Sequence, residues 1–278
     1  MLGRQRSGSV VCRSCGRLVG VNDATCYECG ARYPGLWGFA PVFRRLGEDL
    51  GFTKLAIGAC ALLYVASLLL NVQGIGMRGF LGLLSPSPEA TFALGAAGKV
   101  PVLRYHRWWT VLSAGWLHGS LLHIFFNMYW VRTLAPPVAR LYGAGRMVII
   151  YTVSSALGFL LSSTAPYVPL IGGAAPLTLG ASAALMGLLG ALVYYGRRGG
   201  STEIGRWAWG YAIFFFVFGL IMQGVDNWAH LGGFVGGWVA ARFLDPLKPE
   251  RIDHIVAALV CLGASALAVL ASVLTAMR

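Results

Sequence analysis

The chain has 278 residues, of which 57% are hydrophobic and 12% are charged. Soluble domains average about 25% charged residues, and disordered chains are poor in apolar residues, so this composition excludes an ordinary soluble enzyme and a disordered chain. The formal net charge is +12. Because the basic residues stand between apolar runs long enough to cross a membrane, we assign them to a membrane protein and expect no nucleic-acid partner.

The first 54 residues differ from the rest because they are basic and hold four of the six cysteines. These four form two CxxC pairs, each followed by Gly and separated by ten residues: Cys12, Cys15, Cys26 and Cys29. Two such pairs can place four thiolates tetrahedrally around Zn²⁺ at about 2.3 Å. Two disulfides or free thiols are the alternative, and a cytosolic position argues against disulfides.

Four protein ligands leave a zinc ion no open position, so we predict a structural metal and no cofactor for catalysis. A ribbon of this size is too small to fold without such a staple. We therefore expect a zinc ribbon over 1–34 and a basic juxtamembrane linker over 35–54. No apolar run follows Met1 closely enough for a cleavable signal peptide.

Seven apolar runs follow, each close to the roughly 20 residues that a helix needs to cross about 30 Å of hydrocarbon. Isolated strands would leave backbone groups unpaired in lipid, so we predict an all-α, polytopic bundle of seven transmembrane helices. The connection 72–110 is the longest, and its prolines, glycines and aromatic-basic stretch are typical of the membrane interface. The predicted spans are 55–71, 111–131, 146–164, 177–196, 207–223, 228–244 and 255–276.

The distribution of Lys and Arg predicts the orientation of this bundle. Seventeen of the 22 basic residues lie in the N-terminal segment and in the second-to-third, fourth-to-fifth and sixth-to-seventh connections, and five lie on the other side. We therefore expect a multi-pass protein with a cytosolic N-terminus and an external C-terminus, in the cytoplasmic membrane of a prokaryote. An odd number of spans requires the same split.

Polar residues inside membrane spans are costly and usually functional. They occur in the early parts of the second, fourth and sixth spans: His118, His123, Asn127, Ser182 and His230. These three spans run in the same direction, so we expect the residues at one depth, toward the outer leaflet. Asp253 and His254 fall on the cytosolic side and His106 in the outer loop, where we expect solvated surfaces.

A serine and a histidine at one depth suggest nucleophilic catalysis, because a hydroxyl needs a base within about 3 Å. His123 and Asn127 share one helix face and can offer N–H donors to an oxyanion. The N–H of Ser182 adds a third donor if its helix starts just before it.

Each residue also has a structural explanation. Serine in a span usually bonds back to its own helix, and Asn127 alone could join two helices. Asp226 could orient His230, but its place at the water-facing end of the span favours a helix cap. The combination at one depth is what favours catalysis.

These residues resemble the motifs of the rhomboid family of intramembrane serine proteases, over about residues 55–245. Ser182 stands in a Gly-Ala-Ser-Ala sequence similar to the nucleophile motif, and Ala229-His230 with Gly233 and Gly237 is similar to the histidine motif. The resemblance implies that Ser182 is the nucleophile and His230 the general base, without an acid. It implies that His123 and Asn127 stabilise the oxyanion, that His118 is structural and that 246–278 is an extra C-terminal helix.

Three positions depart from the family pattern. Ala183 replaces a usual glycine, Met186 replaces a frequent aromatic residue, and Thr110 follows Trp109 where the family has arginine, with Arg107 displaced. None of them removes a catalytic group.

The resemblance implies an intramembrane serine endopeptidase that cleaves transmembrane segments of partner proteins. The first alternative is a rhomboid-like protein that binds membrane clients without cutting them, and the second is a transporter that uses the intramembrane histidines. The absence of carboxylates inside the spans argues against transport. We expect the ribbon to recruit a cytosolic partner or substrate tail, or else to lie on anionic lipid.

Overall fold

The computed structural model describes residues 4–12, 15–39, 47–78, 82–222 and 224–277. Four basic residues that entered the orientation argument, Arg13, Arg44, Arg45 and Arg278, lie outside the described residues, as does part of the predicted linker.

The N-terminal cysteine-rich segment is a small β-structure. Strands β1 (Ser9–Val11) and β2 (Leu18–Gly20) pair antiparallel, with Val10 opposite Val19, and a 3-10 turn η1 spans Leu36–Gly38. Its core is a cluster of small buried residues: Val10, Cys12, Val19, Val21, Cys26 and Ala31. So small a core fits the expectation that the segment depends on a further staple.

The rest of the described chain is mainly helical. Its longer helices are α2 (Phe52–Leu70), α5 (Leu121–Tyr142), α6 (Ala144–Thr164), α7 (Ser182–Arg198), α8 (Thr202–Ile221), α9 (Asn227–Phe243) and α10 (Ile252–Ala276). Between α2 and α5 lie η2 (Val72–Gly74), β3 (Gly76–Arg78), β4 (Gly82–Ser85), α3 (Pro88–Leu94), η3 (Val100–Arg104), α4 (Thr110–Ser113) and η4 (Ala114–Trp116). Within the described ranges, β3 and β4 pair as an antiparallel hairpin.

Each predicted span overlaps one long helix, and the second span differs most, at both ends, since α5 continues to Tyr142 rather than ending at 131. The second helix begins at Leu121 rather than at 111, because 110–116 forms short helical turns and Ser120 then caps α5 by accepting the N–H of His123. The fourth begins at Ser182 rather than at 177. His118 therefore lies in the turn before α5, which corrects its predicted place inside the second span.

In the described residues, four helices are long and apolar enough to cross a membrane: α2, α6, α8 and α10. The protein is thus a multi-pass, mostly helical membrane protein. Helices α7 and α9 have 17 residues each, about 26 Å of helix.

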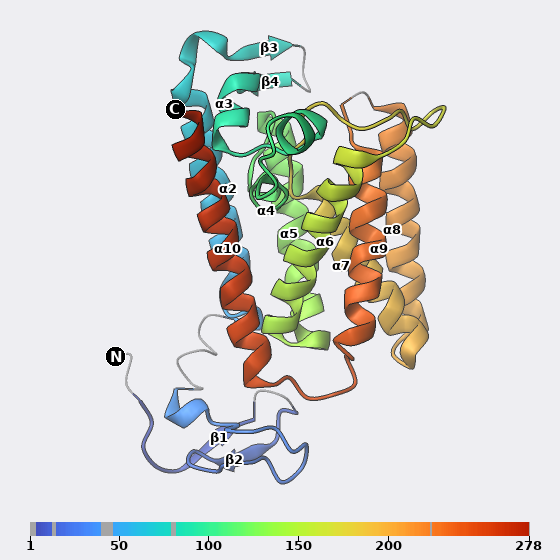
Figure 1. Ribbon diagram of the computed structural model, residues 1–278. Helices are drawn as coiled ribbons and strands as arrows, with labels where there is room; N and C mark the ends of the chain where they lie inside the picture. Colours follow the sequence, from blue (N-terminus) through green and yellow to red (C-terminus); the bar gives the residue numbers. More distant parts are fainter. Residues whose placement is uncertain (1–3, 13–14, 40–46, 79–81, 223, 278) are drawn as a thin grey trace.

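Helix α7 lies at the centre of the bundle, and every residue from Ala183 to Val193 is buried. It packs most extensively on α9 and also contacts α5, α6 and α8. Helix α10 instead packs on α3, α4 and α6. Figure 1 shows the β1–β2 ribbon at one end of the helical body, and the C-terminus with β3, β4, α3 and α4 at the other.

Candidate active site

The starts of α7 and α9 meet because glycines remove side chains from the contact. A methyl group on Gly233 would run into the backbone of Ala183, and one on Gly237 into the backbone of Gly187. Gly190 fits in the same way against the carbonyl of Phe234. Glycines therefore allow a close approach of these two helices. It brings the first turn of α7 beside the first turns of α9.

Ser182 is the first residue of α7 and is half-buried. The first helical N–H that bonds back is that of Leu185, which donates to the carbonyl of Ala181 at 3.0 Å. The N–H of Ser182 is therefore one of the groups that a helix start leaves without an intrahelical acceptor. This start meets the condition set for a third oxyanion donor.

His230 lies in the first turn of α9 and is only 5% exposed. Its Nδ1 makes no hydrogen bond to any described residue, and no hydrogen bond joins His230 to Ser182 within the described chain. The geometry thus brings the two helix starts together but does not show a formed serine–histidine pair.

Asp226 caps α9, as predicted. One carboxylate oxygen accepts the N–H of Ala229 at 2.9 Å, and the other accepts the hydroxyl of Ser162 on α6. Because both oxygens are engaged in these contacts, the carboxylate is held at the helix end, away from an orienting role toward His230.

His123 faces the loop that leads to Ser182. Its Nδ1 accepts the N–H of Gly119 at 3.3 Å, so the proton of a neutral ring is on Nε2. A methyl group on Gly180 would lie 2.7 Å from that Nε2 and from Cε1. Gly180 also has φ of +125°, a conformation that favours glycine. The donor edge of His123 therefore borders the segment two residues before Ser182.

Asn127 is buried in α5, and its Nδ2 donates to the carbonyl of His123 at 2.8 Å. One amide hydrogen thus bonds to the residue's own helix rather than joining two helices, and the second remains for another acceptor. His118 is 1% exposed and packs edge-on against His123, with ring centroids 5.2 Å apart.

Of the polar groups assigned to solvated surfaces, two are exposed and His254 is partly buried. His106 is exposed, and Asp253 forms an ion pair of 2.7 Å with Arg251 at the start of α10. Sequence reasoning did not find Gly119, which acts through its backbone N–H and has no side-chain signal.

A family model for the rhomboid domain matches residues 105–246, half of the chain. This chain belongs to the rhomboid family. The matched range contains Ser182, His230, His123 and Asn127, and it ends before α10 begins.

Individual rhomboid relatives agree with this assignment. The rhomboid protease GluP of Bacillus subtilis (strain 168) is 31% identical over 163 residues, which are 58% of this chain and 30% of that protein. RHOMBOID-like protein 1 of Arabidopsis thaliana is 29% identical over 175 residues, 60% and 42% of the two chains. Rhomboid-like protease 5 of Toxoplasma gondii is 32% identical over 179 residues, 59% and 20%. The chain thus spans less than half the length of these relatives.

One departure from the rhomboid pattern has a structural counterpart. A methyl group on Gly158 of α6 would come 2.9 Å from the Cβ of Ala183, which is itself fully buried. The methyl group of Ala183 thus fits because position 158 is a glycine and has no side chain there. Met186 is also buried, at 4% exposure.

The four cysteines of the ribbon come together as a metal site requires. All four sulfur atoms lie within 4.8 Å of one another, with Cys12–Cys29 at 3.8 Å and Cys15–Cys26 at 3.7 Å. A zinc tetrahedron with bonds of about 2.3 Å has sulfur–sulfur edges of about 3.8 Å. The backbone N–H of Cys29 lowers the pKa of the Cys26 thiol to about 7, whereas burial raises the pKa of the Cys29 thiol to about 12. The donor set and spacing therefore fit zinc.

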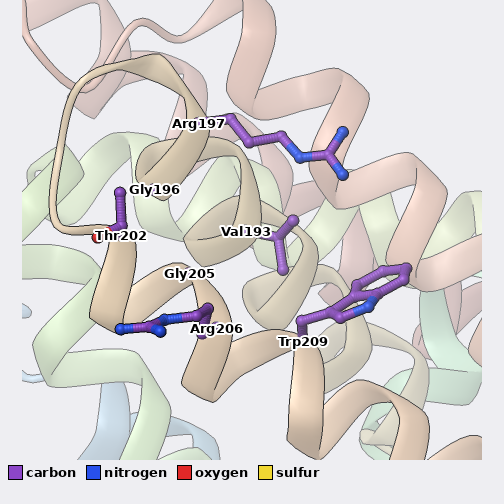
Figure 2. A pocket seen from close by; sticks show the side chains of 7 residues that line it. All are labelled: Val193, Gly196, Arg197, Thr202, Gly205, Arg206 and Trp209. Atoms are coloured by element: carbon purple, nitrogen blue, oxygen red, sulfur yellow. The ribbon is translucent and has the colours of Figure 1, made fainter.

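A cavity of about 250 Å³ lies elsewhere, between the end of α7 and the start of α8. Figure 2 shows Arg197 and Arg206 at this cavity, extending in different directions, with Trp209 beside it. None of the candidate catalytic residues lines it.

Proposed function

We propose that this rhomboid is an intramembrane serine endopeptidase that cuts within or near transmembrane segments of other proteins. Membership of a family that contains named proteases supports the reaction class. The proposal is supported by the approach of three segments: the free start of α7 with Ser182, the glycine-packed start of α9 with His230, and the donor edge of His123 beside Gly180.

In the proposed reaction, the Ser182 hydroxyl attacks the substrate carbonyl while His230 takes its proton. His123, Asn127 and the Ser182 N–H donate hydrogen bonds to the oxyanion that forms. His230 then gives the proton to the leaving amine, and water hydrolyses the acyl-enzyme. Ser182 and His230 must come within hydrogen-bond range for this step, and catalytic hydrogen bonds that are long in free enzymes commonly tighten when substrate binds.

The substrate must unwind near the cut, since carbonyls in a helix are already hydrogen-bonded. We therefore expect glycine, proline or other small residues there. The proposed protein has seven transmembrane helices, with its C-terminus outside. In chain order it has a cytosolic ribbon over 1–34, a linker over 35–54, a six-helix core over 55–245 and a seventh helix over 246–278. A prokaryotic cytoplasmic membrane is the proposed location.

Replacing Ser182 or His230 by alanine tests the dyad. We expect each variant to lose at least about a thousandfold in cleavage of a fluorogenic transmembrane peptide in detergent, as happens when a member of a serine–histidine pair is removed. Ser163→Ala and His106→Ala are the matched controls. Ser163 bonds back to the carbonyl of Phe159 in its own helix at 2.7 Å, and His106 is exposed.

Both controls should cut at the wild-type rate. Undiminished cleavage by Ser182→Ala or His230→Ala would show that the dyad is misassigned. Stable binding of several unstable helices by a wild-type protein that cuts none of them would favour the client-binding alternative.

We propose that the ribbon holds a structural zinc ion and recruits a cytosolic partner or substrate tail. Zinc ligands bind as thiolates, so apparent affinity should rise with pH as fewer protons must be displaced. Competition with a coloured chelator measures this. Cys12→Ser should release the metal, whereas Cys261→Ser on α10 should retain one zinc per chain. Equal zinc content in the two variants would refute the site.

A further inference from the structure

The C-terminal turns of α10 make a buried polar junction with the segment that precedes α4. Ser272 of α10 is 0% exposed. Its hydroxyl accepts the indole N–H of Trp109 at 3.0 Å, and its carbonyl accepts Nη2 of Arg107 at 2.8 Å. A helix that only anchored the chain in lipid would have no need of such contacts.

Arg107 joins two helix ends at this junction. Its other terminal nitrogen, Nη1, donates to the carbonyl of Phe92 in the last turn of α3 at 2.8 Å, and its guanidinium carbon lies 4.4 Å from the centroid of the Phe92 ring. The C-terminal ends of helices carry partial negative charge, so a cation between α3 and α10 is stabilised there. Arg107 is only 5% exposed, which makes these acceptors important to it.

A short chain of contacts leads from the junction to the nucleophile. The hydroxyl of Thr110 donates to the carbonyl of Arg107 at 2.7 Å, which fixes the start of α4. At the end of α4, the carbonyl of Ala114 accepts the N–H of Gly180 at 3.0 Å. Gly180 borders His123 and stands two residues before Ser182. The position of α4 therefore bears on the loop that carries the site.

A second contact ties α4 to the same junction. The hydroxyl of Ser113 donates to the carbonyl of Gly95 at 2.7 Å. Gly95 has φ of +106°, and a methyl group there would collide with the hydroxyls of both Ser113 and Ser272. The ends of α3, α4 and α10 thus pack around one glycine.

We propose that α10 is a positioning element of the active site. Ser272 holds Arg107 and Trp109, and through α4 these hold the loop at Gly180 and the edge of His123 in place. The rhomboid-domain match ends at residue 246, so this role belongs to the part of the chain beyond it. The inference rests on the proposed protease function for its kinetic consequence but not for the junction itself.

A double-mutant cycle on the full-length protein tests the proposal, with Ser272→Ala, Trp109→Phe and both together. Each single change removes the bond between Trp109 and Ser272, and one bond corresponds to about a three- to tenfold effect. Ser272→Ala also removes the bond from its hydroxyl to the carbonyl of Ala268 at 2.8 Å, which is of the kind that the control below removes. We expect kcat to fall by about that factor in each single variant, with little change in KM. The double variant should be no less active than the less active of the two single variants. Rates are measured well below the unfolding temperature, where a purely structural loss leaves kcat unchanged.

Ser265→Ala is the matched control, because Ser265 is buried in the same helix and its hydroxyl bonds back to the carbonyl of Cys261 at 3.0 Å. Its kcat should equal that of the wild type. Additive effects of the two changes, or an equal loss in Ser265→Ala, would overturn the proposal.

Hydrogen exchange separates this proposal from the protease assignment. If the wild type cuts no peptide, the assignment fails, and the junction is judged by amide exchange over residues 105–120. Faster exchange there in Ser272→Ala than in Ser265→Ala supports the positioning role, and equal exchange refutes it.

Discussion

The contact between α7 and α9 and the contact between α10 and the residues before α4 hold two sides of one candidate site by different means. In the first, Gly187, Gly190, Gly233 and Gly237 leave out side chains so that backbones touch. In the second, Arg107, Trp109 and Ser272 fill the contact with buried hydrogen bonds. Lipid gives helices little hydrophobic reason to associate, so close packing and polar contacts are the two means available.

The difference shows how each contact will fail. A glycine contact tolerates no added atom, because the neighbour is backbone and cannot move away. A polar contact tolerates added atoms better, but it fails when one partner is lost and the other stays buried without a bond. Substitutions that remove a polar group should therefore be most harmful near the two ends of α10. Substitutions that add a methyl group should be most harmful between α7 and α9.

The largest effect is expected in the connection that leads into α10, where Arg146 of α6 makes a second polar contact. Its guanidinium donates to the carbonyls of Asp245 at 2.6 Å and Lys248 at 2.8 Å, and its N–H donates to the carboxylate of Glu250 at 3.0 Å. Arg146→Met removes two charged hydrogen bonds and should cost about 3 kcal/mol of the free energy of unfolding. Thermal unfolding in detergent measures it.

Arg198→Met is the control for this prediction. Arg198 pairs with the Asp245 carboxylate at 3.2 Å, but its side chain is 48% exposed. Exposed pairs contribute about 0–1 kcal/mol, so the unfolding temperature should change little. Equal losses in the two variants would mean that burial of the polar contact is not what matters.

A smaller loss is expected from Gly237→Ala. The added methyl meets the backbone of Gly187, and overpacking of this kind costs about 1–3 kcal/mol. Cleavage should fall with stability, because Ser182 and His230 are carried by the two helices that are pushed apart. Thermal unfolding and the peptide assay follow both effects.

Gly263→Ala on α10 is the matched change, since nothing lies within 4 Å of its added methyl. It should be neutral or stabilise by up to about 1 kcal/mol, because alanine favours helices over glycine. Harmless Gly237→Ala would show that the glycine contact is not tight.

The two contacts also differ in how well the sequence predicts them. Glycines three and seven residues after His230 lie on one helix face, so their close approach to α7 could be predicted from spacing. The bond between Trp109 and Ser272 joins residues 163 positions apart and has no periodic signal. Trp109 and Arg107 were noted only as departures from a motif, and Ser272 is one of several serines in apolar runs.

The helix starts show the same limit. Hydropathy predicted the long helices well, but it placed the start of the second one at 111, before the turns of 110–116 and the capping residue Ser120. Apolar content is the same in a turn buried by neighbours and in a helix facing lipid. His118 was therefore assigned to a span although it precedes α5. The capping role of Asp226 was predicted correctly because a polar residue just before an apolar run is a local signal.

Asp226→Asn is expected to have the smallest effect and separates a helix cap from a catalytic acid. Asparagine caps helices about as well as aspartate, so stability should change by less than about 0.5 kcal/mol. With both carboxylate oxygens engaged by Ala229 and Ser162, we expect cleavage within about tenfold of the wild type. Loss of the orienting carboxylate from a true triad lowers kcat by about 10⁴. A fall of that size would make Asp226 part of the catalytic machinery. A wild-type rate would mean that Asp226 only joins α6 to α9, and that the glycine packing already sets the position of His230.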